Sequence, residues 1–168
     1  GWAMAGICLI RLKDVRPKGL GAAFGISSEN AAHRIAVEWD ENGITREGVF
    51  IPRRDTSSTL QSLIGSRIFP GIHHRAHFVI AESHDEYRLE MKSHEKSCAV
   101  RLHARRVSTL PASSLFDSLE TASDFFARGS AGYSATEKAD CCEGLELYTH
   151  GWQVEPLEVL QVESSFFD

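Results

Sequence analysis

The sequence lacks any apolar run long enough to cross a membrane. Its most apolar stretch, residues 2–10, has about half of the ~20 residues that a membrane helix requires, and it ends at Arg11. No basic segment precedes this stretch, as it would in a secretory signal peptide. We therefore predict neither a membrane span nor a signal peptide, and we expect a cytoplasmic protein.

Cysteine is scarce, with four residues in the chain: Cys8, Cys98, Cys141 and Cys142. No pair has the Cys-x-x-Cys spacing of a zinc site, and the adjacent Cys141 and Cys142 cannot bridge each other without strain. This usage is typical of reduced thiols in the cytoplasm. At 168 residues and 42% hydrophobic content, the chain can bury a core without disulfides or metal. We predict a single domain over residues 1–168.

An excess of basic residues is also missing. The formal net charge is −5 and the isoelectric point is near 5.9, which argues against a nucleic-acid partner because phosphate binding requires clustered lysine and arginine. The glycines Gly19, Gly21 and Gly25 do not have dinucleotide-binding spacing, and no helix pattern follows them. The sequence also lacks the Gly-x-Ser-x-Gly turn of many serine hydrolases.

What the sequence does contain is a series of short strand patterns. Hydrophobic periodicity predicts strands over 2–12, 32–39, 44–51, 72–81, 87–92, 97–107, 144–149 and 154–164, and helices over 57–68 and 117–128. The turn Asp40-Glu41-Asn42-Gly43 indicates a hairpin, because Asn-Gly accepts the positive φ angles that tight turns require. Few helices separate the strands, so the fold class we predict is α+β: a curved, mostly antiparallel, barrel-like sheet with two short helices.

Several different short motifs follow one another along the chain. They are residues 6–11, Arg16-Pro17, Ser28-Glu29-Asn30, Pro52-Arg53-Arg54-Asp55, Phe69-Pro70-Gly71, Gly132-Tyr133-Ser134 and residues 152–157. In order and spacing they resemble the YqjF-like bacterial family of the acetoacetate decarboxylase-like superfamily. The resemblance implies a barrel with a central pocket. It also implies a preceding strand and helix that this chain lacks.

The catalytic lysine of that superfamily is missing. In the decarboxylases Phe-Pro or Tyr-Pro is followed directly by a lysine that forms a Schiff base, whereas Gly71 follows Pro70 here. The five lysines of this chain lie among charged or loop residues, where solvation keeps them cationic. We therefore expect no Schiff-base chemistry.

A dense polar segment follows Gly71. If Gly71 points into the barrel as the family lysine does, strand alternation turns His73, Arg75 and His77 inward. The same alternation turns His74, Ala76, Phe78 and Ile80 outward against the helix predicted over 57–68. Arginine and histidine in a pocket are typical of a site for a carboxylate or an enolate oxygen.

The resemblance adds further residues to this site. It brings Glu29 and Arg53 near the pocket, Tyr133 can donate a hydrogen bond, and Trp152 can form a wall. The candidate ligand-binding residues are Glu29, Arg53, His73, Arg75, His77, Tyr133 and Trp152. Each is also typical of a rim or core position.

Eight histidines raise the question of a metal site. His73 and His77 lie about 13 Å apart on one straight strand at ~3.3 Å per residue, so they cannot share an ion. The chain has no His-x-His and no His-Glu-x-x-His motif. We predict no metal and no cofactor. A metal site formed by residues far apart in the sequence, such as His33 or His103, is left open. The stripe of Arg101, His103 and Arg105 reads as a solvated strand face.

Three functions remain open at this point. The first is binding of a small anionic organic molecule, a carboxylate or keto acid, in the pocket without Schiff-base chemistry. The second is an enzyme that uses His73 or Glu29 as a general acid or base on a keto or hydroxy acid. The third is a structural or interaction module with a vestigial pocket. Assembly into a homo-oligomer is also left open.

Overall fold

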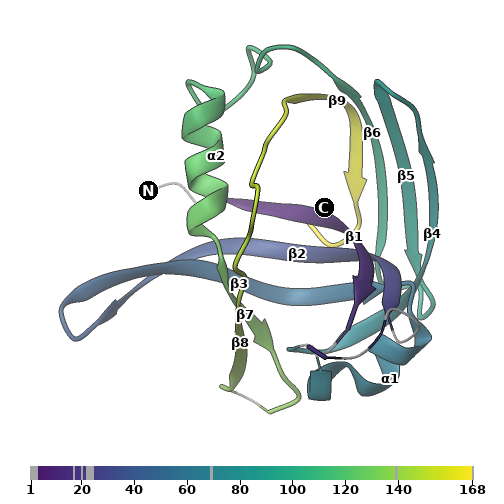
Figure 1. Ribbon diagram of the computed structural model, residues 1–168, viewed down its shortest axis with the longest axis vertical. Helices are drawn as coiled ribbons and strands as arrows, with labels where there is room; N and C mark the ends of the chain where they lie inside the picture. Colours follow the sequence, from purple (N-terminus) through teal and green to yellow (C-terminus); the bar gives the residue numbers. More distant parts are fainter. Residues whose placement is uncertain are drawn as a thin grey trace. The chain divides into compact units, whose positions relative to one another are not determined.

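The computed structural model describes residues 4–16, 18, 19, 21, 25–68, 70–138 and 140–167, without the side chains of residues 64–68 (Figure 1). Trp2, Ala3, Pro17 and Phe69, which entered the predicted first strand and the family motifs, lie outside the described residues. The chain divides into two compact units, residues 1–76 with 131–145 and residues 77–130 with 146–168. The single domain of residues 1–168 stays a prediction.

The first unit is built around three long antiparallel strands. Its elements are β1 (Ala5–Val15), β2 (Ile26–Glu41), β3 (Ile44–Thr56), α1 (Thr59–Ile68), the start of β4 (His73–Glu82), β7 (Ala131–Ala135) and β8 (Cys142–Glu146). Strands β1, β2 and β3 pair antiparallel in sequence order. The far end of β3 pairs in parallel with β4, and its middle pairs in parallel with β7. Our prediction contained no strand at β7.

The hairpin between β2 and β3 confirms the turn predicted from Asn-Gly. Asn42 and Gly43 both have positive φ angles, 57° and 78°, which match the right-handed twist of the strands they join. The backbone N–H of Gly43 donates to Oδ1 of Asp40 over 3.0 Å and closes the turn. Both strands are longer than predicted, because the pairing continues to Thr56 at the far end of β3.

The second unit contains β5 (Glu86–Ser93), β6 (Ala99–Arg106), α2 (Leu119–Arg128), β9 (Leu157–Ser164) and the end of β4. Strands β5, β6 and β9 pair antiparallel. The alternation predicted for β6 is confirmed, because Val100 and Ala104 are buried while Arg101 and Arg105 are exposed. One face of this sheet therefore packs into the core and the other is solvated.

Helix α2 begins two residues after the predicted start. The side chain of Ser118 caps it by accepting a hydrogen bond from the backbone N–H of Thr121 over 3.1 Å. Ala122 is the residue of this helix that is buried, and Phe116 packs against Phe125 and Phe126 of α2.

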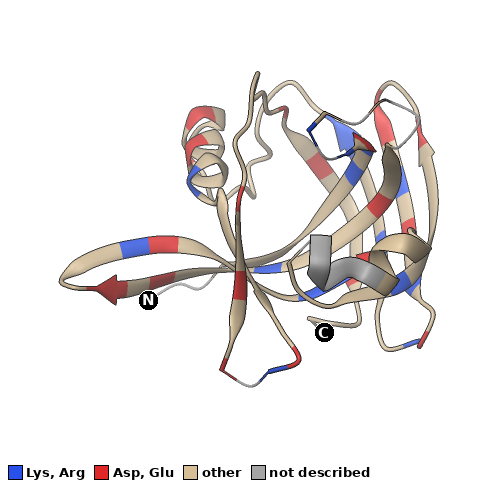
Figure 2. Ribbon diagram, turned by 60° about the horizontal axis from the view of Figure 1, so that its bottom comes forward, with Lys and Arg blue, Asp and Glu red and all other residues tan. Residues whose placement is uncertain are grey.

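Across the chain the hydrogen-bonded strand order is β1-β2-β3-β4-β5-β6-β9, with β7 paired to β3 and β8 paired to β7. The predicted α+β class with a mostly antiparallel sheet and two short helices is confirmed. The strand order has two ends, so a barrel-like closure stays a prediction. Neither described helix is long and apolar enough to span a membrane. Acidic and basic residues are interspersed along the strands (Figure 2).

Candidate functional site

Polar side chains of the first unit lie on two opposite faces of β2, β3 and β4. The register pairs His33 with Arg53 and pairs Arg54 with His73. Neighbouring residues of a strand point to opposite faces, so Arg53 and Asp55 share one face and Arg54 lies on the other. The two faces carry different chemistry.

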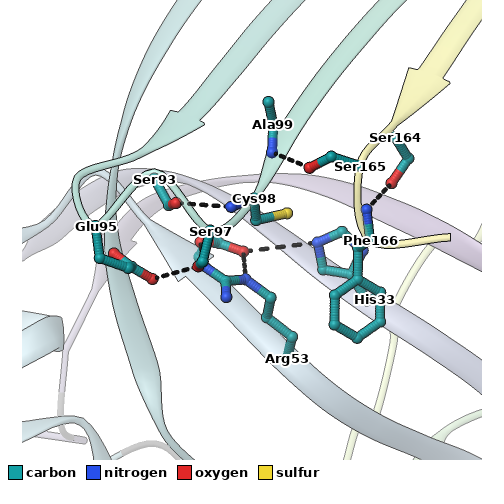
Figure 3. Close-up of polar contacts among 11 residues, drawn as sticks. His33, Arg53, Ser93, Glu95, Ser97, Cys98, Ala99, Ser164, Ser165 and Phe166 are labelled. Carbon is teal, nitrogen blue, oxygen red and sulfur yellow. Dashed lines mark hydrogen bonds and ion pairs between the residues drawn. The ribbon is translucent and has the colours of Figure 1, made fainter. Parts of the chain in front are cut away.

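The first face holds a buried ionic cluster of His33, Arg53 and Asp55. His33 and Arg53 both form ion pairs with the carboxylate of Asp55. Figure 3 labels His33 and Arg53, whose side chains point toward one another from neighbouring strands. Arg53 donates from Nε to Oδ2 and from Nη2 to Oδ1 of Asp55, each over 2.8 Å. Nε2 of His33 lies 3.6 Å from Oδ2 of Asp55. This bidentate geometry is the strongest that an arginine and a carboxylate can form.

This cluster is buried, and its charged groups contact one another. Asp55 and His33 are fully buried, and Arg53 is 8% exposed. Burial by itself would raise the pKa of Asp55, but the contacts with His33 and Arg53 outweigh it and hold that pKa below its usual 3.8. Arg53, which we predicted as a ligand-binding residue, is thus already engaged by a carboxylate of the chain.

The second face is covered in part by helix α1. The side-chain oxygen Oε1 of Gln61 accepts from the hydroxyl of Ser28 over 3.0 Å and from that of Thr56 over 2.6 Å. Leu60 and Leu63 of the same helix do not face the sheet, because they are 47% and 79% exposed. The sheet offers hydroxyl groups here, and burying them requires a hydrogen-bonding partner. The amide of Gln61 meets that requirement and leucine does not.

Beside this contact lie four half-buried basic side chains, which we call the arginine face: Arg34, Arg54, His73 and Arg75. Arg54 donates from Nε to the hydroxyl of Ser134 over 3.0 Å. The Nε atoms of Arg34 and Arg75 are buried and have no hydrogen-bond partner among the described residues. Within the same residues, no carboxylate forms an ion pair with any of the three arginines.

Two side chains of the arginine face, Arg54 and His73, have lowered pKa values, because they are buried and lie beside other cations. Burial, followed by the charge of Arg34, lowers the pKa of Arg54 to about 10. Burial and the charge of Arg54 lower the pKa of His73 to about 4, although its ring nitrogen Nε2 lies 3.3 Å from the carbonyl oxygen of Pro70, which acts in the opposite direction. At neutral pH Arg54 is therefore cationic and His73 is neutral.

The orientation we predicted for β4 is reversed. Arg75 pairs with Thr56, whose hydroxyl reaches Gln61, so His73 and Arg75 lie on the face that α1 covers. His74 pairs with Asp55 and lies on the opposite face. The prediction counted strand alternation from Gly71, but Gly71 has φ +86° and β4 begins at His73. Alternation cannot be counted through a residue in the left-handed region.

Gly71 occupies a position where no side chain fits. Its backbone N–H donates to Oε2 of Glu143 over 2.8 Å, which holds the turn against β8. A Cβ atom at Gly71 would lie 2.5 Å from Cβ of Ser134 on β7. All five lysines are exposed, as expected from their neighbours in the sequence.

Three of the four remaining predicted residues have partners of their own. Glu29 accepts from Nε of Arg11 over 2.6 Å, and Tyr133 packs edge-on against Trp39 with ring centroids 5.4 Å apart. In the second unit, His77 is exposed and Trp152 donates to the hydroxyl of Ser123 over 2.9 Å. Their assignment to a ligand site stays a prediction.

The sequence interpretation missed Arg34 and Ser134. Arg34 follows His33 at a register shift between β2 and β3, and Ser134 lies 80 residues from the Arg54 it contacts. Neither residue belongs to a local pattern that indicates a site. Comparison with known proteins gives no match to a family model, to a curated protein or to a solved structure. The family assignment therefore stays a prediction.

Proposed function

We propose that this protein binds a small organic anion, a carboxylate or keto acid, on the arginine face and without Schiff-base chemistry. One observation carries the proposal: Arg34, Arg54 and Arg75 are half-buried, and none has a carboxylate partner among the described residues. Burying a cation is costly unless a counter-charge compensates it. An external anion supplies that counter-charge.

The chemistry of the side chains favours a carboxylate. The planar guanidinium of arginine presents paired N–H groups that match the two oxygens of a carboxylate. Ser134 adds a hydroxyl next to Arg54, and neutral His73 adds hydrogen-bonding capacity without further charge. The net charge of −5 disfavours a polyanion such as nucleic acid, so the proposed ligand is small.

We propose in addition that the fold is of the barrel-like, acetoacetate decarboxylase-like kind and that the chain is YqjF-like. The α+β class and the mostly antiparallel sheet support this. Gly71 in place of the lysine fits a member that has lost the decarboxylase reaction. A cytoplasmic location is supported by the cysteines, because no disulfide joins any of the four.

General acid–base catalysis has less support. A histidine with a pKa of about 4 is a weak base at neutral pH, and Glu29 is paired with Arg11. The alternative of an enzyme that acts on a keto or hydroxy acid through these two residues would require a bound substrate to raise the pKa of His73.

A thermal-shift titration tests the proposal. Acetate, pyruvate, acetoacetate and succinate are added to the protein, with sodium chloride at equal ionic strength as the blank. A ligand at 100 times its dissociation constant adds about 2.7 kcal/mol to the free energy of unfolding, or roughly 5–10 °C in Tm at this size. We expect at least one carboxylate to give this shift and the variants Arg54→Gln and Arg34→Gln to lose it.

Arg46→Gln is the matched control, because Arg46 is exposed and pairs with Glu41 on the β2–β3 hairpin. This variant should keep the full shift. The proposal is wrong if none of the four anions stabilises the protein, or if Arg54→Gln and Arg34→Gln respond as strongly as Arg46→Gln does.

A further inference from the structure

The second unit ends in an open sheet edge. Strand β9 pairs with β6 on one side, and no strand of the described residues pairs with its other side. Such an edge presents unpaired backbone N–H and C=O groups, which an added strand can satisfy. The side chains of β9 determine what kind of strand fits.

One face of β9 is apolar and exposed. Val162 pairs with Leu102 and Val159 with Ala104, so both lie on the side of β6 that packs into the core. Ala104 is 1% exposed, whereas Val159 and Val162 are 54% and 60% exposed. The apolar surface of this sheet therefore extends beyond its covered part, to the open edge.

The other face of β9 is acidic and completes two rows of charge across the sheet. In the first row, Arg101 lies between Glu90 of β5, at 3.4 Å, and Glu163 of β9, at 3.3 Å. In the second row, Arg105 pairs in register with Glu86 and forms an ion pair with Glu158 at 2.6 Å. Both rows run acid, base, acid from β5 to β9. On a strand added beside β9, a basic residue would therefore continue each row.

We propose that the open edge of β9 binds an extended segment of a partner protein in which apolar residues alternate with lysine or arginine. Its backbone pairs with β9, its apolar side chains lie beside Val159 and Val162, and its basic side chains lie opposite Glu158 and Glu163. The basic residues are four positions apart, as Arg101 and Arg105 are on β6, where they face the same two glutamates.

A second copy of this chain does not fit the same edge. Antiparallel pairing of two β9 strands about a two-fold axis puts the acidic face of one strand beside the acidic face of the other. Like charges opposite each other destabilise a strand pair. The extra residue Leu160, at the register shift of β9, also disfavours pairing with an identical strand.

Fluorescence anisotropy with two labelled peptides tests this inference. The peptide TVRVTVRV carries arginines four positions apart among valines, and TVEVTVEV is its acidic counterpart. We expect the basic peptide to bind, with an affinity that falls as salt is added, and the acidic peptide not to bind. Hydrogen exchange should show new protection in residues 157–164 when the basic peptide is present.

The double variant Glu158→Gln with Glu163→Gln should weaken binding of the basic peptide roughly 3- to 30-fold, because two cross-strand charge pairs are lost. The double variant Glu38→Gln with Glu41→Gln removes two exposed acids from the β2–β3 hairpin and should bind as the unmodified protein does. If the β9 variant does not fold, the affinities of the two peptides for the unmodified protein still test the inference. Equal binding of both peptides, protection outside β9, or a dimer formed through β9 in sedimentation would overturn the inference.

Discussion

Gly71, in the turn before β4, and Ser134, on β7, lie so close together that a Cβ atom on Gly71 would be 2.5 Å from Cβ of Ser134. Side chains in folded proteins do not approach at that distance, so this turn accepts glycine alone unless the backbone moves. The same Ser134 hydroxyl accepts from Nε of Arg54. This tight contact between Gly71 and Ser134 therefore supports the arginine face.

We predict that Gly71→Ala destabilises the protein by about 2–5 kcal/mol, because the new methyl group overlaps Ser134 and φ is +86°. Gly6→Ala is the control, since a Cβ at Gly6 has no neighbour within 4 Å and its unfolding free energy should not fall. Urea unfolding measures both. Adding Ser134→Gly should recover part of the loss in the Gly71→Ala background; no recovery would show that the contact with Ser134 is not the cause.

We predict that sodium borohydride with acetoacetate or pyruvate leaves the protein unmodified. All five lysines are exposed, so none occupies the buried position that Schiff-base chemistry requires. Intact-mass spectrometry detects an adduct if one forms. One stoichiometric adduct that maps to a single lysine would contradict the prediction and, with it, the proposal of binding without Schiff-base chemistry.

The pKa of His73 predicts a specific loss of stability in mild acid. The unfolded chain protonates His73 near pH 6.5, whereas the native state resists protonation until about pH 4. Between these values the unfolded state binds more protons, so the free energy of unfolding falls as the pH is lowered. The total fall from this residue is at most about 3 kcal/mol, and less where solvent screens the charge.

His73→Gln should flatten the stability profile between pH 6.5 and pH 4. His94→Gln, at an exposed turn position, should leave it unchanged. Urea unfolding at a series of pH values measures both profiles. If His73→Gln has the same slope as the unmodified protein, His73 does not titrate as the geometry indicates.

Asp55→Asn should destabilise the protein by about 3–5 kcal/mol, because it removes the carboxylate charge that pairs with the buried guanidinium of Arg53. Glu41→Gln breaks an exposed pair with Arg46 and should cost about 0.5 kcal/mol or less. The folded-state pKa of Asp55 lies below 3.8, so the stabilisation it provides is present above that pH and is lost as the pH falls further. Thermal unfolding at neutral pH measures the loss of stability in both variants. Equal losses would show that the buried cluster of His33, Arg53 and Asp55 does not stabilise the fold.

Local chemistry predicted the elements whose structure is decided within a few residues. Asn42 and Gly43 specify their turn because few residues accept positive φ angles. The alternation of Val100 and Arg101 along β6 specifies which face is buried, since strand side chains alternate. The helix predicted over 117–128 begins two residues later, because Ser118 caps it through a residue three positions away. These features gave the α+β class and the mostly antiparallel sheet.

The candidate site could be predicted only in part. The sequence drew attention to His73 and Arg75, and both lie on the arginine face. It placed them on the wrong side of β4, because the backbone at Gly71 interrupts the strand pattern. It also drew attention to Arg53 without showing that Asp55, two residues away on the same face, already engages it.

By itself the sequence determined most of the segments that become strands and the Asn-Gly turn that joins β2 to β3. Tertiary structure alone decided that Arg34 of β2, Arg54 of β3 and Ser134 of β7 meet, and that Gln61 rather than a leucine of α1 faces the sheet. The physical reason is the separation along the chain between the residues that interact. Turn geometry and alternation act between neighbouring residues, whereas these contacts arise from strand pairings that join residues up to 80 positions apart and from the need to satisfy the polar groups those pairings bury.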